Sequence, residues 1–216
     1  MIRKILITGF EPFNQDVINP SAEVVKRLPA SIKDVELIRR IIPTVRYRAL
    51  DVIKDAILKE KPDVIVSIGQ AGGRPMISVE RIAINVDDFR IPDNQGNQPI
   101  DEPINKAGPA AYFSALPIKA MVQAVLRAGI PAQVTNSAGT FVCNHVFYGV
   151  ADFAATSFPE LKTGFIHIPY MEEQVLDKPG EPSMHLEEMV RGIESAIEAI
   201  INHPDADCVE IGGSLD

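Results

Sequence analysis

Tryptophan is absent from this sequence, and aromatic residues of all kinds make up only 6% of its 216 residues. Basic residues are also in deficit, because 21 Lys and Arg stand against 29 Asp and Glu, for a formal net charge of −8. Nucleic acids and anionic membrane surfaces attract proteins through basic patches. The composition therefore argues against nucleic acid or a membrane surface as the main partner.

Cysteine is nearly absent as well, since Cys143 and Cys208 are the only two. Neither belongs to a CxxC pair or to a Cys/His series with the spacing of a metal site, and a chain of this length does not need disulfides to fold. No apolar run approaches the roughly 18 residues of a membrane span, and the apolar stretch at residues 5–9 is too short for a signal peptide. We expect a reduced, cytoplasmic protein.

The sequence does contain an alternation of short apolar strands and amphipathic helices. Strands are predicted at residues 5–9, 35–42, 63–69, 77–86, 132–136 and 163–168. Helices are predicted from Pro20 and at residues 44–61, 117–128, 143–156 and 183–201. The length suits one domain, residues 1–216, and 46% hydrophobic residues suffice for a packed core. The alternation predicts an α/β fold in which helices cover both faces of a mostly parallel sheet.

Residues 87–108 form the longest irregular stretch, rich in Pro, Asn and Gly. Such a length is typical of a lid or binding loop, and equally of a surface connection. In folds of this class the active site lies beyond the carboxyl ends of the strands. Reactive side chains are therefore expected where predicted strands end and helices begin.

Cys143 is the candidate nucleophile. It follows a glycine-containing segment, SAGTFV at 137–142, and falls in the first turn of a predicted helix. Unpaired N–H groups and the helix dipole stabilise a thiolate there and lower the thiol pKa, and the same N–H groups can hold an oxyanion. A buried cysteine that packs as a small hydrophobic residue fits the position equally well. Cys208, in a polar tail, has no such setting.

A histidine and an acid are available to complete a nucleophile–base–acid set. His167 ends an apolar strand, although a lone histidine there is more commonly a core residue bonded to backbone. Glu80 interrupts the predicted 77–86 strand on the same face as the apolar residues that follow it, so its burial requires a partner. That partner is a protonated histidine or a basic residue at the strand end. His145, two residues from Cys143, should face elsewhere.

The segment GQAGGR at 69–74 follows a strand and superficially resembles a nucleotide-binding loop. It lacks the GxGxxG pattern and the P-loop lysine, and it leads to another strand instead of a clear helix. Backbone groups that hold a small polar ligand, or an ordinary tight turn, fit this segment better.

Four sequence blocks together resemble the pyroglutamyl peptidase I family, the cysteine peptidases that remove an N-terminal pyroglutamyl residue. The blocks are GFEPF at 9–13 with NPS at 19–21, GQAGGR leading to ERIAIN across 69–85, SAGTFVCN at 137–144, and FIHIP at 165–169. They occur in the family's order and cover nearly the whole chain. The resemblance implies an open three-layer α/β/α sandwich, no cofactor, no metal, and homo-oligomers that are frequently tetramers.

The resemblance also implies roles for individual residues. The family's nucleophile, its base and its orienting acid fall on Cys143, His167 and Glu80. Residues that wall, hold or flank the pyroglutamyl lactam fall on Phe10, Phe13, Asn19, Gln70, Arg90 and Val142. The implied substrates are peptides or proteins with an N-terminal pyroglutamyl residue.

Two other classes of function remain open from the residues alone. A non-catalytic module for a small ligand or nucleotide would use the 69–73 loop and leave Cys143 structural. A metal-dependent amidase would require Cys143, His145 and His167 as ligands, although no closely spaced set such as HExxH occurs.

Overall fold

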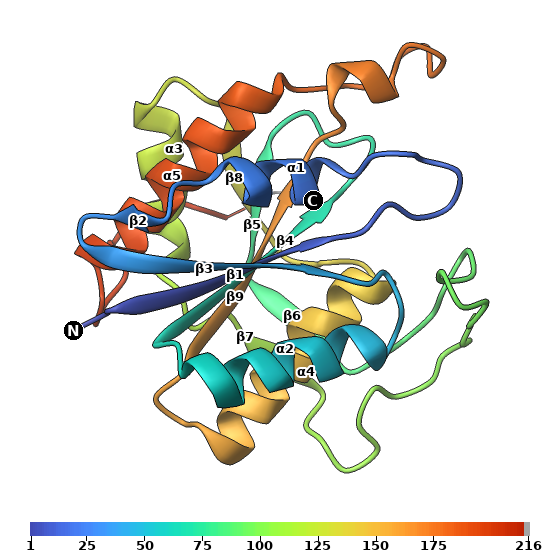
Figure 1. Cartoon of the computed structure of the whole chain (residues 1–216), viewed down its shortest axis with the longest axis horizontal. Coiled ribbons are helices and arrows are strands. Elements are labelled where there is room, and N and C mark those ends of the chain that lie inside the picture. The colour runs from blue at the N-terminus through green and yellow to red at the C-terminus, as the bar shows by residue number, and fades with distance from the viewer. Residues whose placement is uncertain (214–216) are drawn as a thin grey trace.

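The computed structural model of the protein describes residues 1–213, which form a central sheet with helices on both faces (Figure 1). The sheet has seven strands. From one edge to the other they are β2 (Ser31–Ile32), β3 (Val35–Ile42), β1 (Lys4–Phe10), β4 (Val64–Gln70), β9 (Lys162–Ile168), β5 (Ile77–Glu80) and β8 (Ala132–Thr135). The four central strands β3, β1, β4 and β9 are parallel, so their carboxyl ends share one edge of the sheet.

Strand β5 runs antiparallel to β9, and the register of this pairing matters for the site. Ser78 lies opposite His167 in the antiparallel β5–β9 pair, while Gly69 lies beside His167 in the parallel β4–β9 pair. Strand β8 then runs parallel to β5, and the short β2 runs antiparallel to β3. The prediction of a mostly parallel sheet is confirmed.

Helices form the outer two layers, as predicted. They are α1 (Pro20–Arg27), α2 (Arg48–Glu60), α3 (Ile118–Arg127), α4 (Val142–Ser157) and α5 (Leu186–Asn202), with a 3₁₀ turn, η1, at Glu172–Gln174. Helices α1, α3 and α5 cover one face of the sheet, and α2 and α4 cover the other (Figure 1). None of the helices in residues 1–213 combines the length and the apolar composition needed to cross a membrane.

Strand β1 shows why the central strands are apolar throughout. Ile5 and Ile7 are buried against α1 and its neighbours, and Leu6, between them, is buried against α2 and α4. Successive side chains of a strand point to opposite faces, so a strand covered on both faces has no solvent-facing positions. Two apolar cores therefore flank the sheet.

The predicted 77–86 strand is wrong in one respect, because it breaks at Arg81. Its second half is β6 (Ile82–Ile84), which pairs with β7 (Ala111–Phe113) in a separate two-stranded sheet. The side chain of Asn144 in α4 binds this segment by three hydrogen bonds. Its Oδ1 accepts from the N–H of Ile84, and its Nδ2 donates to the carbonyls of Ile84 and Val86. The apolar residues after Glu80 therefore do not share its sheet face.

The helix predicted from residue 44 begins four residues later, at Arg48. Thr44 does not cap it, because the Thr44 hydroxyl donates to the carbonyl of Glu11. Residues 44–47 instead cross the carboxyl edge of the sheet, and Tyr47 has a positive φ of 53°. The 87–108 stretch is irregular as predicted, apart from an isolated bridge between Asp87 and Glu102.

Candidate active site

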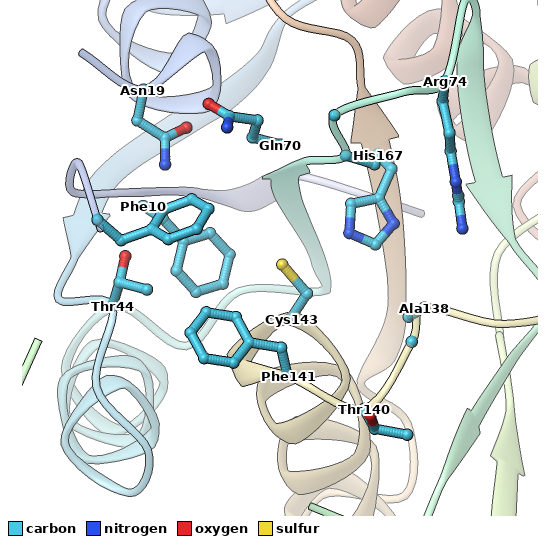
Figure 2. A pocket seen from close by; sticks show the side chains of 14 residues that line it. Phe10, Asn19, Thr44, Gln70, Arg74, Ala138, Thr140, Phe141, Cys143 and His167 are labelled. Carbon is cyan, nitrogen blue, oxygen red and sulfur yellow. The ribbon is translucent and has the colours of Figure 1, made fainter. Parts of the chain in front are cut away.

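A pocket opens at the carboxyl edge of the sheet, between the ends of β1, β4 and β9 and the beginning of α4 (Figure 2). Its volume is about 260 Å³. This is slightly below the range of pockets for drug-sized ligands, so it suits a small chemical group. The residues that line it are Phe10, Phe13, Asn19, Thr44, Gln70, Ala71, Gly72, Arg74, Ala138, Gly139, Thr140, Phe141, Cys143 and His167.

Cys143 is the second residue of α4, and its sulfur points into this pocket beside the ring of His167 (Figure 2). No side chain among the described residues caps the first N–H groups of α4. Gly69 makes room for the sulfur, because a Cβ atom built there would lie 2.8 Å from Sγ of Cys143. Gly69 is the β-sheet neighbour of His167. The sulfur therefore lies next to the imidazole, in space that a side chain at position 69 would otherwise fill.

Burial determines the protonation of Cys143. Burial and the carboxylate of Glu80 raise the pKa of the Cys143 thiol to about 12, and the guanidinium of Arg74 lowers it only in part. The predicted lowering of this pKa by the helix end is therefore wrong. The thiol holds its proton at neutral pH, so a base must remove that proton when the sulfur reacts.

His167 and Glu80 form a buried pair whose geometry is suited to such a base. His167 Nδ1 lies 2.7 Å from Oε1 of Glu80, and the two side chains are 4% and 0% exposed. Ser78 is directly opposite His167, so Glu80, two residues further along β5, is its diagonal neighbour on the same sheet face. With Nδ1 donating to the carboxylate, Nε2 of His167 is left as the acceptor.

Glu80 stays ionised although it is buried. Burial alone would raise its pKa, but hydrogen bonds from His167 and Thr135 and the charge of Arg74 lower the pKa of Glu80 below its ordinary value. Arg74 donates to Oε1 at 2.6 Å, and the Thr135 hydroxyl donates to Oε2 at 2.5 Å. Both partners predicted for this carboxylate, a histidine and a basic residue, are therefore present.

Gln70 reaches the pocket from the end of β4, and a second glutamine orients its amide. Oε1 of Gln174 accepts the N–H of Met171, so its Nε2 donates to Oε1 of Gln70 at 3.0 Å. The amide nitrogen of Gln70 is then the donor, and it lies 3.4 Å from Oδ2 of Asp16. Gln70 therefore presents a hydrogen-bond donor beside the pocket.

Comparison with known proteins places this geometry in a family. A sequence model described as "Pyroglutamyl peptidase" matches residues 3–203, nearly the whole chain. The chain belongs to the pyroglutamyl peptidase family. Among its relatives is the pyrrolidone-carboxylate peptidase of Finegoldia magna, which is 56% identical over 97% of this chain and 98% of its own. The enzyme of the same name from Treponema denticola is 56% identical over 98% of this chain and 99% of its own.

Solved structures of the pyroglutamyl peptidase family share the fold. The crystal structure of pyroglutamyl peptidase I from Bacillus amyloliquefaciens superposes with a TM-score of 0.94 at 46% identity, covering 98% of this chain and 100% of that one. A variant of the pyrrolidone carboxyl peptidase from Pyrococcus furiosus has a TM-score of 0.88 at 42% identity, covering 92% of this chain and 98% of that one. The predicted open α/β/α sandwich is confirmed, and these relatives do not favour the alternative of a non-catalytic binding module.

Four of the six residues expected to surround the substrate in this pyroglutamyl peptidase family member do line the pocket: Phe10, Phe13, Asn19 and Gln70. Val142 and Arg90 do not. Val142 is fully buried in the core beneath α2 and α4, because it begins the helix with its side chain toward the sheet. Arg90 is exposed in the irregular stretch.

Phe141, next to Val142, is the aromatic wall on this side, and its ring centroid lies 5.8 Å from that of Phe13. Sequence reasoning also missed Thr44, Arg74 and Gln174. Phe141 and Arg74 fall within the blocks that carry the family resemblance, so their signal was available. Thr44 and Gln174 lie outside these blocks, and only the folded chain brings them to the site.

The remaining histidine near Cys143 and the second cysteine lie elsewhere. His145 is fully buried and hydrogen-bonded to Asp87. Its side chain therefore points away from Cys143, as predicted. Cys208 packs beside the core under α1, α3 and α5, on the other face of the sheet. Among residues 1–213, no group of three or more His, Cys, Asp or Glu side chains is arranged to hold a metal ion.

Proposed function

We propose that this chain is a cysteine exopeptidase that hydrolyses the amide bond after an N-terminal pyroglutamyl residue. The observation that carries the proposal is the lining of the pocket beside Cys143. Within the described residues that lining has aromatic walls and amide side chains but no Asp or Glu. A free α-amine is a cation that would be desolvated there without a counter-charge, whereas the pyroglutamyl lactam is neutral.

Cys143 is the proposed nucleophile and His167 the proposed base. As the sulfur attacks the carbonyl carbon, Nε2 of His167 takes the thiol proton, and the ionised Glu80 stabilises the imidazolium. N–H groups in the first turn of α4 hold the oxyanion. His167 then gives its proton to the leaving amine. Water, deprotonated by His167, hydrolyses the thioester and releases pyroglutamate.

The pyroglutamyl ring is proposed to lie between Phe10, Phe13 and Phe141. Asn19 and the donor amide of Gln70 supply polar contacts, and a donor complements the lactam carbonyl oxygen. Aromatic walls with a few placed polar groups are the usual composition of a site for a small ring.

Hydrolysis of a pyroglutamyl-anilide tests the proposal. We expect turnover in the wild type, loss to background in Cys143→Ala, and near wild-type turnover in Cys208→Ser, which is the matched control on the far face of the sheet. Circular dichroism verifies that both variants are folded. Full activity of Cys143→Ala would remove the proposed nucleophile.

We further propose that residues 1–216 work as one catalytic domain, without a cofactor or metal, in the cytoplasm, as a homo-oligomer and most simply a tetramer. Two free cysteines without a disulfide between them support a reducing compartment. Activity should survive EDTA and be maintained by a reducing agent, because an oxidised thiol cannot attack. Light scattering on the purified protein measures the oligomeric state, and a monomeric mass would contradict that part.

A further inference from the structure

A second buried set of charged and polar side chains, Arg46, Asp87 and His145, lies outside the pocket and takes no part in the proposed chemistry. Asp87 and His145 are 0% exposed, and the side chain of Arg46 is 10% exposed. Asp87 Oδ2 lies 2.8 Å from His145 Nδ1 and 3.1 Å from a terminal nitrogen of Arg46. We call these three residues the Arg46–Asp87–His145 cluster.

The hydrogen bonds of this cluster determine the tautomer of His145. The backbone N–H of Tyr47 donates to Nε2 of His145 at 3.0 Å, so Nε2 is an acceptor. The ring proton is therefore on Nδ1, which donates to Asp87. The imidazole is neutral, and the charge pair within the cluster is Arg46 with Asp87.

Stability alone is a weak reason for such a cluster. Burying an ion pair costs desolvation that the attraction offsets only in part. Here Nε of Arg46 and Oδ1 of Asp87 also have no hydrogen-bond partner among residues 1–213. The cluster does, however, join three segments that are far apart in sequence: residues 44–47, the start of α4, and residues 87–102.

Each of the three segments carries or supports part of the pocket wall. The 44–47 segment supplies Thr44, and the start of α4 supplies Phe141 (Figure 2). In the third segment, the N–H of Asp88 donates to the carbonyl of Thr140, and the Thr140 hydroxyl donates back to the carbonyl of Asp88. The ring of Phe89 then packs edge-on against Phe141, with centroids 4.8 Å apart.

The backbone of the 44–47 segment is strained, so contacts from the rest of the protein must maintain its conformation. Tyr47 has φ 53° and ψ −50°, and the N–H of Arg48 donates to the carbonyl of Arg46 across it. This is the γ-turn that is rare because it is strained, and strained backbone persists only where its surroundings constrain it. His145 provides the constraint at Tyr47 itself: it accepts the Tyr47 N–H, and its ring packs edge-on against the Tyr47 ring at 5.0 Å. Further along the segment, the Asp93 carboxylate accepts the N–H of Arg46, and the carbonyl of Thr44 accepts the N–H of Asn94.

We propose that Arg46, Asp87 and His145 are positioning residues for the substrate pocket. By holding the 44–47 segment and the Phe141 wall against one another, they set the affinity for the pyroglutamyl ring and leave the reaction at Cys143 unchanged. The inference rests on the proposed function, since it assumes that the pocket binds this ring.

The test separates KM from kcat for a pyroglutamyl-anilide. His145→Phe keeps the ring and its packing on Tyr47 but removes both hydrogen bonds, so KM should rise about tenfold while kcat stays within about threefold. The side-chain oxygen of His145→Gln can still accept from the Tyr47 N–H. The KM of this variant should therefore lie between those of the wild type and His145→Phe. Asp87→Asn, which keeps the side-chain shape, should give a smaller increase. His185→Phe, the same change at the N-cap of α5, is the matched control and should leave KM unaltered.

Two kinetic outcomes overturn the proposal: a folded His145→Phe protein with wild-type KM, whatever its melting temperature, or a loss confined to kcat. Hydrogen exchange provides a readout that needs no substrate. Amides of residues 44–47 and 140–141 should exchange faster in His145→Phe than in the wild type, and unchanged exchange there also overturns it. If the wild type does not hydrolyse the anilide but exchange increases in the variant, the proposed function fails and the positioning role stands. If His145→Phe does not fold, the KM and exchange of Asp87→Asn decide.

Discussion

At the scale of single residues, the site depends on how three ionisable side chains alter one another. The bonds to His167 and Thr135 keep Glu80 ionised despite its burial, and the same carboxylate contributes to the raised pKa of Cys143. A sulfur in this environment is a poor nucleophile until a base takes its proton. Nε2 of His167 is placed to do so, because Nδ1 is held by Glu80.

Substitution of His167 should lower kcat/KM more than substitution of Glu80. His167→Ala removes the base and should lower kcat/KM by about 10⁴-fold or more, whereas Glu80→Gln keeps the shape and should cost about 10²-fold. The measurement is initial rates with a pyroglutamyl-anilide. His203→Ala, at the end of α5, is the control and should be neutral. If His203→Ala lowered kcat/KM strongly and His167→Ala did not, His167 would not be the base.

Alkylation of Cys143 by iodoacetamide should follow its raised pKa. In a Cys208→Ser background the rate should increase about tenfold per pH unit through the neutral and mildly alkaline range, because only the thiolate reacts. Adding Glu80→Gln removes one cause of the raised pKa, so Cys143 should react faster at a given pH even though turnover is slower. A pH-independent rate would mean that the thiol is already ionised.

At the scale of secondary-structure elements, the register of β5 against β9 and the break at Arg81 assemble the site. Because Ser78 of β5 is paired with His167 of β9, Glu80, two residues further along β5, lies on the same sheet face as His167. Asn144, the residue after Cys143, takes the hydrogen bonds of β6 and so connects the beginning of α4 to the chain that leaves Glu80. The contacts of Asn144 therefore connect the helix that carries Cys143 to the chain that directly follows Glu80.

The closeness of α4 to β4 makes Gly69 a sensitive position. Gly69→Ala would add a Cβ atom 2.8 Å from Sγ of Cys143 and 2.9 Å from the Phe165 ring, so the sulfur must rotate away from His167. We expect a loss of kcat of roughly 10²-fold or more, since small misplacements of reacting groups have effects of this size. Rates and thermal melts should be compared with Gly213→Ala, where an added Cβ atom would meet no atom within 4 Å among the described residues other than its chain neighbour. Wild-type kcat in Gly69→Ala would contradict the close packing.

At the scale of the whole molecule, the pocket exists because the carboxyl ends of three parallel strands and the amino end of one helix meet at one edge. Phe10, Gln70 and His167 come from β1, β4 and β9, and Cys143 and Phe141 come from the start of α4. Selectivity is therefore a property of the assembled edge and not of any one segment.

This assembled pocket should discriminate against a ring of similar size but different polarity. A prolyl group lacks the lactam carbonyl and carries a protonated amine, which finds no carboxylate in the described lining. A prolyl-anilide should be cleaved at least ~10³-fold less efficiently in kcat/KM than the pyroglutamyl-anilide, because sites that hydrogen-bond their substrate reject analogues that lack the bonding group. Comparable efficiency for the two anilides would refute a lactam-specific pocket.

Sequence by itself determined the layers and the candidate reactive side chains. Apolar strands alternating with amphipathic helices allow few arrangements other than a sheet covered on both faces, and the placement of Cys143 and His167 at element ends followed from that pattern. Tertiary structure alone decided the rest. Whether Glu80 meets His167 depends on the pairing register of β5 with β9, and the pKa of Cys143 is raised by burial and by the Glu80 carboxylate, neither of which local sequence reveals. Thr44, Gln174 and the Arg46–Asp87–His145 cluster act through contacts between distant segments, and local sequence patterns carry no record of such contacts.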